Sequence, residues 1–162
     1  MKLRAAIGWA GLMTLAACAG LSNPLQDPDV RLNRVVVRGV GLTGGTLDLI
    51  VGVHNPNNFD LRGTELQVGF DVENAHVGDV RYADDFAVQR GDTTMLTLPL
   101  SFEWAGVSSA VRAALGYGEI PYTMKGELRL QTPFGTAAVP FTRQGRAPLS
   151  RSGGRMPVPS GN

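Results

Sequence analysis

The stretch LDLIVGVHNPN, residues 47–57, decides how this sequence folds. Large apolar side chains recur at every second position over residues 47–53, a period typical of a β-strand that buries one face. Proline fixes its own φ and disfavours the helical region for the residue before it. Asparagine side chains bond nearby backbone groups. We therefore interpret Asn55, Pro56 and Asn57 as a structural turn that ends the strand and directs the chain to the next one.

The same period recurs along the chain, between segments rich in turn-forming residues. Apolar runs or alternations lie at residues 35–37, 65–73, 96–102, 120–130 and 139–141. One segment differs, because the apolar residues of 103–115 have helical spacing and Gly116 follows as a suitable C-cap. Strands with one apolar face need a second layer to cover it. The pattern thus predicts an all-β fold, an antiparallel β-sandwich of about seven strands with one helix before the late strands.

Two local patterns refine this prediction. Residues 39–44 match Gly-x-Gly-x-x-Gly, but a strand follows them rather than the helix that a nucleotide-binding loop requires. We interpret them as a hairpin or bulge. Pro99 interrupts an alternating strand, which favours a place at a sheet edge or a bulge.

The N-terminus, residues 1–17, has the pattern of a signal peptide. Lys2 and Arg4 precede an apolar run that is too short for a membrane span, which needs about 20 residues. The next residues resemble the bacterial lipobox: Leu15, Ala16, Ala17 and Cys18. The resemblance implies cleavage before Cys18 and acylation of its thiol and new amine, with fatty acids such as palmitate. An ordinary signal peptide with an incidental cysteine is the alternative.

The location follows from the same resemblance. Ala19, rather than aspartate, comes after the cysteine, which implies the outer membrane facing the periplasm in a Gram-negative host. Two or three acyl chains on one residue anchor a protein firmly, whereas one chain binds weakly. Removal of Lys2 and Arg4 from the 15 basic residues leaves 13 beside 14 acidic ones, so lipid rather than charge would hold the protein to the membrane.

The chain divides into four predicted segments. Residues 1–17 form the signal peptide and residues 18–29, with two prolines, a lipidated tether. Residues 30–142 form the domain. Residues 143–162 contain four arginines, three prolines and four glycines but no acid, a composition that predicts a flexible tail.

The strand over residues 47–54 leads into Asn-Pro-Asn, and this step resembles the water stress and hypersensitive response (WHy) domain of type 2 late embryogenesis abundant (LEA14-like) proteins. The resemblance continues through Phe59, Leu61, the segment 78–82 and the Gly-x-x-x-x-Leu-x-Leu-Pro-Leu pattern of 91–100. It covers roughly residues 30–142. The resemblance implies an immunoglobulin- or fibronectin III-like sandwich with one helix, and a link to desiccation, cold and other stress.

Residues suited to catalysis or to metal binding are sparse. The single cysteine excludes an internal disulfide, and the net charge of +1 argues against nucleic-acid binding. His54 and His76 could in principle share a metal with Asp84 or Asp85, but these residues do not have the spacing of a recognised metal-ligand motif. We interpret the two histidines as a polar strand end and a solvent-facing turn. We expect no enzyme activity, no metal and no cofactor.

The C-terminal arginines are the main electrostatic feature of the sequence. Residues 19–142 carry nine basic and fourteen acidic side chains, whereas the tail is purely basic. The tail arginines are possible contacts to weakly bound client proteins or to an anionic envelope surface: Arg143, Arg146, Arg151 and Arg155.

We expect a membrane-tethered stress-protection protein. Two alternatives stay open: a structural adaptor that binds a partner by a strand edge, and a carrier of envelope lipid or another hydrophobic ligand.

Overall fold

The computed structural model describes residues 25–106 and 118–152. These residues form eight strands and one short 3-10 helix: β1 (Asp29–Val40), β2 (Gly44–His54), β3 (Leu61–Val72), β4 (Ala75–Tyr82), β5 (Phe86–Val88), β6 (Thr93–Glu103), η1 (Trp104–Gly106), β7 (Glu119–Thr132) and β8 (Gly135–Arg151). The all-β prediction is confirmed for this part of the chain. No helix among these residues has the length and apolar character needed to cross a membrane.

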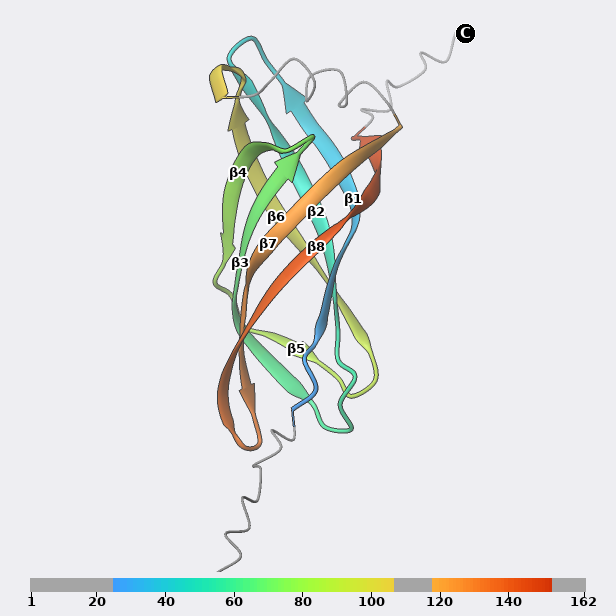
Figure 1. Cartoon of the computed structure of the whole chain (residues 1–162), viewed down its shortest axis with the longest axis vertical. Helices are drawn as coiled ribbons and strands as arrows, with labels where there is room; N and C mark the ends of the chain where they lie inside the picture. Colours follow the sequence, from blue (N-terminus) through green and yellow to red (C-terminus); the bar gives the residue numbers. More distant parts are fainter. Residues whose placement is uncertain (1–24, 107–117, 153–162) are drawn as a thin grey trace, which may run out of the picture.

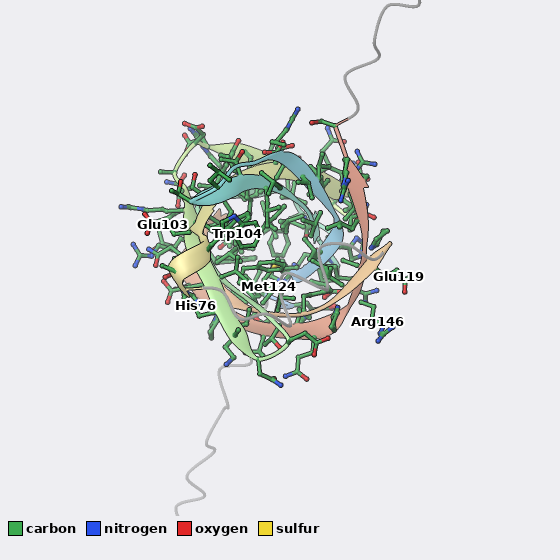
Figure 2. The ribbon with its side chains drawn as sticks, turned by 90° about the horizontal axis from the view of Figure 1, so that it is seen from above. His76, Glu103, Trp104, Glu119, Met124 and Arg146 are labelled. Carbon is green, nitrogen blue, oxygen red and sulfur yellow. The ribbon has the colours of Figure 1, made fainter. Side chains whose placement is uncertain are left out.

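The strands form one sheet that curves around the core in the order β4-β3-β7-β8-β1-β2-β6, and β5 pairs with the first residues of β3. The pairing between β1 and β8 is parallel, from Val35 opposite Leu149 to Val37 opposite Arg151. It joins the β6-β2-β1 wall to the β4-β3-β7-β8 wall. Seen from the end, the strands surround the interior side chains (Figure 2). The prediction of a purely antiparallel sandwich is therefore wrong, and the fold is a nearly closed, barrel-like mixed sheet.

The length of β8 explains this difference. The strand runs on through Arg151, so the predicted domain end at residue 142, with a flexible tail from 143, is wrong for residues 143–151. Ala147 is fully buried and Leu149 packs against the core, and both pair with other strands in this stretch. One buried side chain, one partly buried side chain and two neighbouring strands thus order a segment whose composition looks like that of a tail. Residues 153–162 lie outside the described residues.

The two end strands of the sheet, β4 and β6, meet at a seam. They pack against each other without forming a hydrogen-bonded ladder, whereas β6 pairs with β2 along its whole length. The approach is close, because a Cβ placed on Gly78 would lie 2.9 Å from Cδ1 of Leu100. Pro99 lies in β6, so its predicted place on an edge strand is confirmed.

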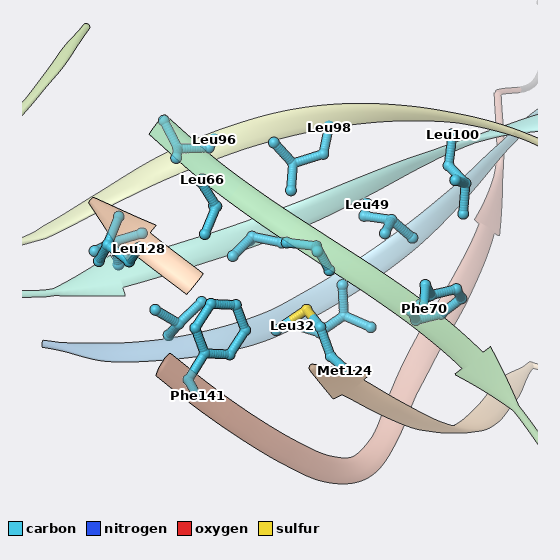
Figure 3. Close-up of a cluster of buried hydrophobic side chains, with 14 of the residues drawn as sticks. Leu32, Leu49, Leu66, Phe70, Leu96, Leu98, Leu100, Met124, Leu128 and Phe141 are labelled. Atoms are coloured by element: carbon cyan, nitrogen blue, oxygen red, sulfur yellow. The ribbon is translucent and has the colours of Figure 1, made fainter. Parts of the chain in front are cut away.

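The interior is filled by apolar side chains from both walls (Figure 3). Leu49 and Leu98 come from the β2–β6 pair, and Phe70 and Met124 come from the β3–β7 pair; all four are fully buried. Burying a side chain of this size contributes about 1.5–3 kcal/mol. The two-residue period in the sequence is therefore the inner face of the sheet.

Two further predictions concern local structure. Residues 39–44 form the β1–β2 hairpin, with a register shift between Val37 and Gly39, as predicted. The predicted helix of residues 103–115 is not seen where the structure describes it, because Glu103 ends β6 and residues 104–106 form a 3-10 turn. Residues 107–115 lie outside the described residues.

Candidate functional site

The Asn55-Pro56-Asn57 corner is the first candidate site. Asn55 is fully buried, and its Nδ2 donates to the carbonyl oxygens of Phe59, at 2.8 Å, and Val88, at 3.1 Å. Its Oδ1 accepts from the backbone N–H and the Nδ2 of Asn57, each at 3.0 Å. One side chain thus ties the loop after β2 to β5.

Asn57 connects the corner to the beginning of the domain. Its Oδ1 accepts from the backbone N–H of Gln26 and its Nδ2 donates to the carbonyl of Gln26, each at 2.8 Å. The neighbouring Leu25 is buried against the core. Residues 25–28, assigned to the tether by the sequence, are therefore fixed to the domain. The amide groups of Asn55 and Asn57 bond to the protein itself, which is what a structural turn requires.

The second candidate site is an open groove of about 660 Å³ on the outer face of β3, β4 and β7. Charged and polar side chains from the three strands line it, and Gly69 provides a floor without a side chain. On the same outer face Glu65 lies between two arginines: Arg81 Nε is 2.6 Å from its Oε1, and Arg129 Nη1 is 3.2 Å from its Oε2. Arg129 also pairs with Glu127 at 3.0 Å.

Hydrogen bonds to Glu65 favour its ionised form. Gln67 donates to its carboxylate, and this bond, followed by the bond from Arg81, holds the pKa of Glu65 below its usual value. Both arginines are about half exposed, so each contributes little to stability. The result is a cross-strand ladder in which opposite charges pair with one another.

His76 lies at one end of the groove, on the outside of the sheet (Figure 2). Its Nδ1 is 2.8 Å from Oδ1 of Asp71, and its Nε2 is 3.2 Å from Oδ2 of Asp79. The hydrogen bond to Asp71 is the main cause that raises the pKa of His76. Burial opposes it as the second-largest effect, and the hydrogen bond and charge of Asp79 raise the pKa further. The imidazolium form is thus favoured on this face.

A metal site shared by His54 and His76 was one possibility raised by the sequence. In the structure His54 bonds instead to the Thr93 hydroxyl at 3.2 Å, whereas His76 interacts with Asp71 and Asp79. Over residues 25–106 and 118–152, no three side chains of histidine, cysteine, aspartate or glutamate gather as metal ligands. Asp85 pairs with Arg62.

The arginines assigned to the tail have different environments. Arg143 binds Asp29 through its Nε, at 3.1 Å, and its Nη2, at 3.0 Å, so it joins β8 to the start of β1. Arg146 and Arg151 lie exposed on β8, and Figure 2 shows Arg146 pointing away from the interior. Arg155 lies outside the described residues. The arginines therefore do not share one mobile tail, because three of them belong to a strand.

The predicted lipidation site Cys18 and the predicted lipobox residues Leu15, Ala16 and Ala17 also lie outside the described residues. Sequence reasoning missed the charged ladder around Glu65. Its members are up to 64 positions apart, and no local pattern brings them together. The register of β3 against β4 and β7 does so.

The overall fold is shared with a solved structure. The solution structure of AT1g01470 from Arabidopsis thaliana superposes with a TM-score of 0.61 at 18% identity, over 81% of this chain and 89% of that one. The solution structure of a late embryogenesis abundant (LEA) protein, At2g46140.1, gives a TM-score of 0.47 at 18% identity, over 76% and 72%. A crystal structure of a protein from Archaeoglobus fulgidus gives 0.44 at 10% identity, over 76% and 96%.

No curated protein sequence matches this chain significantly. The family profile LEA_2, late embryogenesis abundant protein, matches residues 51–145, more than half of the 162 residues. The match begins within β2, includes the Asn-Pro-Asn corner and ends within β8. The chain therefore belongs to the LEA_2 family of late embryogenesis abundant proteins.

Proposed function

We propose that this protein is a non-enzymatic lipoprotein of the bacterial cell envelope whose WHy-like domain protects proteins or the membrane face during desiccation, cold or other stress. The observation that carries the proposal is the LEA_2 match over residues 51–145. The lipobox ending in Cys18 supports the location in the envelope.

The charge arrangement supports protection during drying. Coulomb attraction grows as the effective dielectric falls, so paired charges attract more strongly when water is lost. Glu65 already lies between Arg81 and Arg129, and its partners come from strands on both sides of β3. Strand pairing also satisfies the backbone without water. These features favour a domain that stays folded while it covers other surfaces.

A drying assay tests the proposal. The chain from residue 19 on, which keeps every described residue, is mixed with a labile enzyme, dried and rehydrated. We expect a higher recovery of enzyme activity than with an equal mass of an unrelated β-sandwich protein. Equal recovery would remove the support for a protective function.

The anchor is tested separately. Mass spectrometry of the mature protein from a bacterial envelope should show an N-terminal Cys18 with two or three acyl chains. The Cys18→Ser variant should lose the acyl mass and leave the membrane fraction. An unmodified Cys18 in the native protein would contradict the lipoprotein assignment.

A structural adaptor is the second candidate function. It is favoured by the seam, where β4 and β6 lie side by side as the two ends of the sheet without a ladder between them. An extended peptide can pair with a free strand edge. Crosslinking in intact cells separates the two functions, because a single stoichiometric partner favours the adaptor and many weak clients favour protection.

A further inference from the structure

We propose that the end of the domain formed by Phe134 and Phe59, called here the aromatic tip, rests on the lipid bilayer, with the Phe134 ring inserted at the interface. This inference rests on the anchoring at Cys18 given under the proposed function. It adds an orientation: the aromatic tip faces the membrane and the β1–β2 hairpin faces away from it.

Most of the Phe134 side chain is exposed to solvent. Its side chain is 67% exposed, at the turn between β7 and β8. The Thr132 hydroxyl accepts from the N–H of Phe134 at 3.1 Å and donates to the carbonyl of Gly135 at 2.9 Å. Gly135 has φ +127°, which glycine adopts readily and other residues rarely do. The turn is thus held in a conformation that points an apolar ring outward.

Phe59 supports the ring from the neighbouring loop. The two ring centroids are 5.5 Å apart with an interplanar angle of 84°, an edge-to-face arrangement. Phe59 itself packs against the core. The aromatic tip therefore has a rigid base, and ordering its side chains at a lipid interface costs little further entropy.

The N-terminal segment joins the domain at this same end. Gln26 bonds to Asn57 in both directions, and Asn57 is two residues from Phe59. Figure 1 shows the first described residues, the loop after β2 and the β7–β8 hairpin together at the lower end. Six residues lie between Cys18 and Leu25, so seven steps of at most about 3.3–3.6 Å join the two, or ~25 Å in total. A lipid on Cys18 therefore keeps the aromatic tip close to the bilayer.

Several charged side chains near the aromatic tip are already bonded within the protein. Arg62 pairs with Asp85, and the Asp60 carboxylate accepts from the backbone N–H of Arg90 at 3.0 Å. Arg143 pairs with Asp29 at 3.0 Å. This balance gives no strong attraction to anionic headgroups. We expect contact through the aromatic rings with a zwitterionic surface and little dependence on salt.

The opposite end of the molecule provides a matched control. Leu42 is fully exposed at the tip of the β1–β2 hairpin, so it is apolar and accessible as well. Figure 1 shows this hairpin at the upper end, away from the N-terminal segment. Exposure alone would give both tips equal contact with lipid, whereas anchoring through residues 18–25 favours Phe134.

The experiment uses the full mature lipoprotein in phosphatidylcholine vesicles with or without brominated acyl chains. Two variants carry one tryptophan each, Phe134→Trp and Leu42→Trp, both in a Trp104→Phe background. We expect brominated lipid to quench the tryptophan fluorescence of F134W at least about twofold more strongly than that of L42W. The reason is that an interfacial side chain lies roughly 5–10 Å inside the headgroup boundary. Raising the salt concentration should leave the difference unchanged.

Quenching of F134W that is equal to or weaker than that of L42W would overturn the inference. So would concentration-dependent dimerisation through the aromatic tip, which would assign it to a second copy. The acyl mass on Cys18 is measured on the same samples. If the acyl mass is absent, both the proposed anchoring and this inference are wrong. If it is present but quenching does not favour F134W, only this inference is wrong.

A measurement on the unaltered protein avoids any effect of the substitutions on folding. Amide hydrogen exchange is compared between the lipoprotein in detergent and on vesicles. We expect protection on vesicles at residues 132–136 and none at residues 41–44. Equal exchange of residues 132–136 in both conditions would also overturn the inference.

Discussion

Replacement of Asn55 by alanine tests whether the corner after β2 holds the fold together. The side chain is fully buried and satisfies the Val88 carbonyl and the Asn57 N–H, both in buried surroundings. Asn55→Ala leaves these two groups without partners. Each unsatisfied buried group costs about 1–3 kcal/mol, so we expect a loss of roughly 3–4 kcal/mol. That is a large part of the ~5–15 kcal/mol by which a domain is stable.

The free energy of unfolding is measured by urea denaturation of the chain from residue 19 on. Asn58→Ala is the matched control, because Asn58 lies in the same loop but is exposed. Surface substitutions change stability by about 0.5 kcal/mol or less, and we expect that for Asn58. If Asn55→Ala lowers the free energy of unfolding no more than Asn58→Ala does, the side-chain bonds of Asn55 do not stabilise the domain.

Asn55→Asp keeps the shape but replaces the donating amide by a carboxylate that faces two carbonyl oxygens. Burial beside acceptors raises the folded-state pKa of such a group above its unfolded value. Protonation restores a donor, so the variant should be most stable below the unfolded pKa and lose stability as pH rises through the folded pKa. A variant whose stability shows no pH dependence relative to the parent would contradict this account.

Three further predictions follow from other contacts. Gly126→Ala should lower the free energy of unfolding by about 1–3 kcal/mol, because the added Cβ would lie 1.9 Å from the backbone oxygen of Gln67 in β3. Gly118→Ala is the control, since a Cβ there meets nothing within 4 Å, and thermal unfolding should show no change for it. An NMR titration should show the pKa of His76 raised above the usual value of 6.5, and Asp71→Asn should lower that pKa. The half-exposed pair stabilises the fold only slightly. This stabilisation is fully present below the pKa of His76 in the unfolded chain and is lost as pH rises through its pKa in the folded protein. Ending the chain after residue 142 should abolish cooperative unfolding in urea, because the sheet would lose the pairing between β1 and β8 and the buried Ala147. An unchanged cooperative transition would contradict this prediction.

The parts of the fold that depend on local sequence could be predicted. The alternation over residues 47–53 became β2, with its buried positions facing the core. The glycine-rich segment 39–44 became a hairpin, and Pro99 fell on an edge strand. Each of these features depends on neighbours within a few residues, which is the range over which φ preferences and side-chain periods act.

The second half of β8 could not be predicted from the same signals. Its core-facing side chains, the buried Ala147 and the partly buried Leu149, are separated by Pro148 and flanked by arginines, so the apolar pattern is too sparse to mark a strand. Residues 143–148 continue the pairing with β7, and residues 149–151 pair with Val35–Val37, more than a hundred residues away. Such non-local pairing leaves no trace in local composition.

The candidate sites divide in the same way. The Asn-Pro-Asn step was visible because its turn chemistry lies in three consecutive residues, although its bonds to Gln26 and Val88 were not. The ladder around Glu65 was invisible, because the strand register alone sets its arginines on either side of it.

The sequence by itself determined an all-β domain, its local turns, its family resemblance and the resemblance of residues 15–18 to a lipobox. The tertiary structure decided that the strands join into one mixed sheet, that Arg143 lies in a strand and pairs with Asp29, and that Phe134 lies at the end where the N-terminal segment joins the domain. The physical reason is that side-chain period and φ preference are properties of a short segment, whereas pairing and burial depend on which distant segments meet.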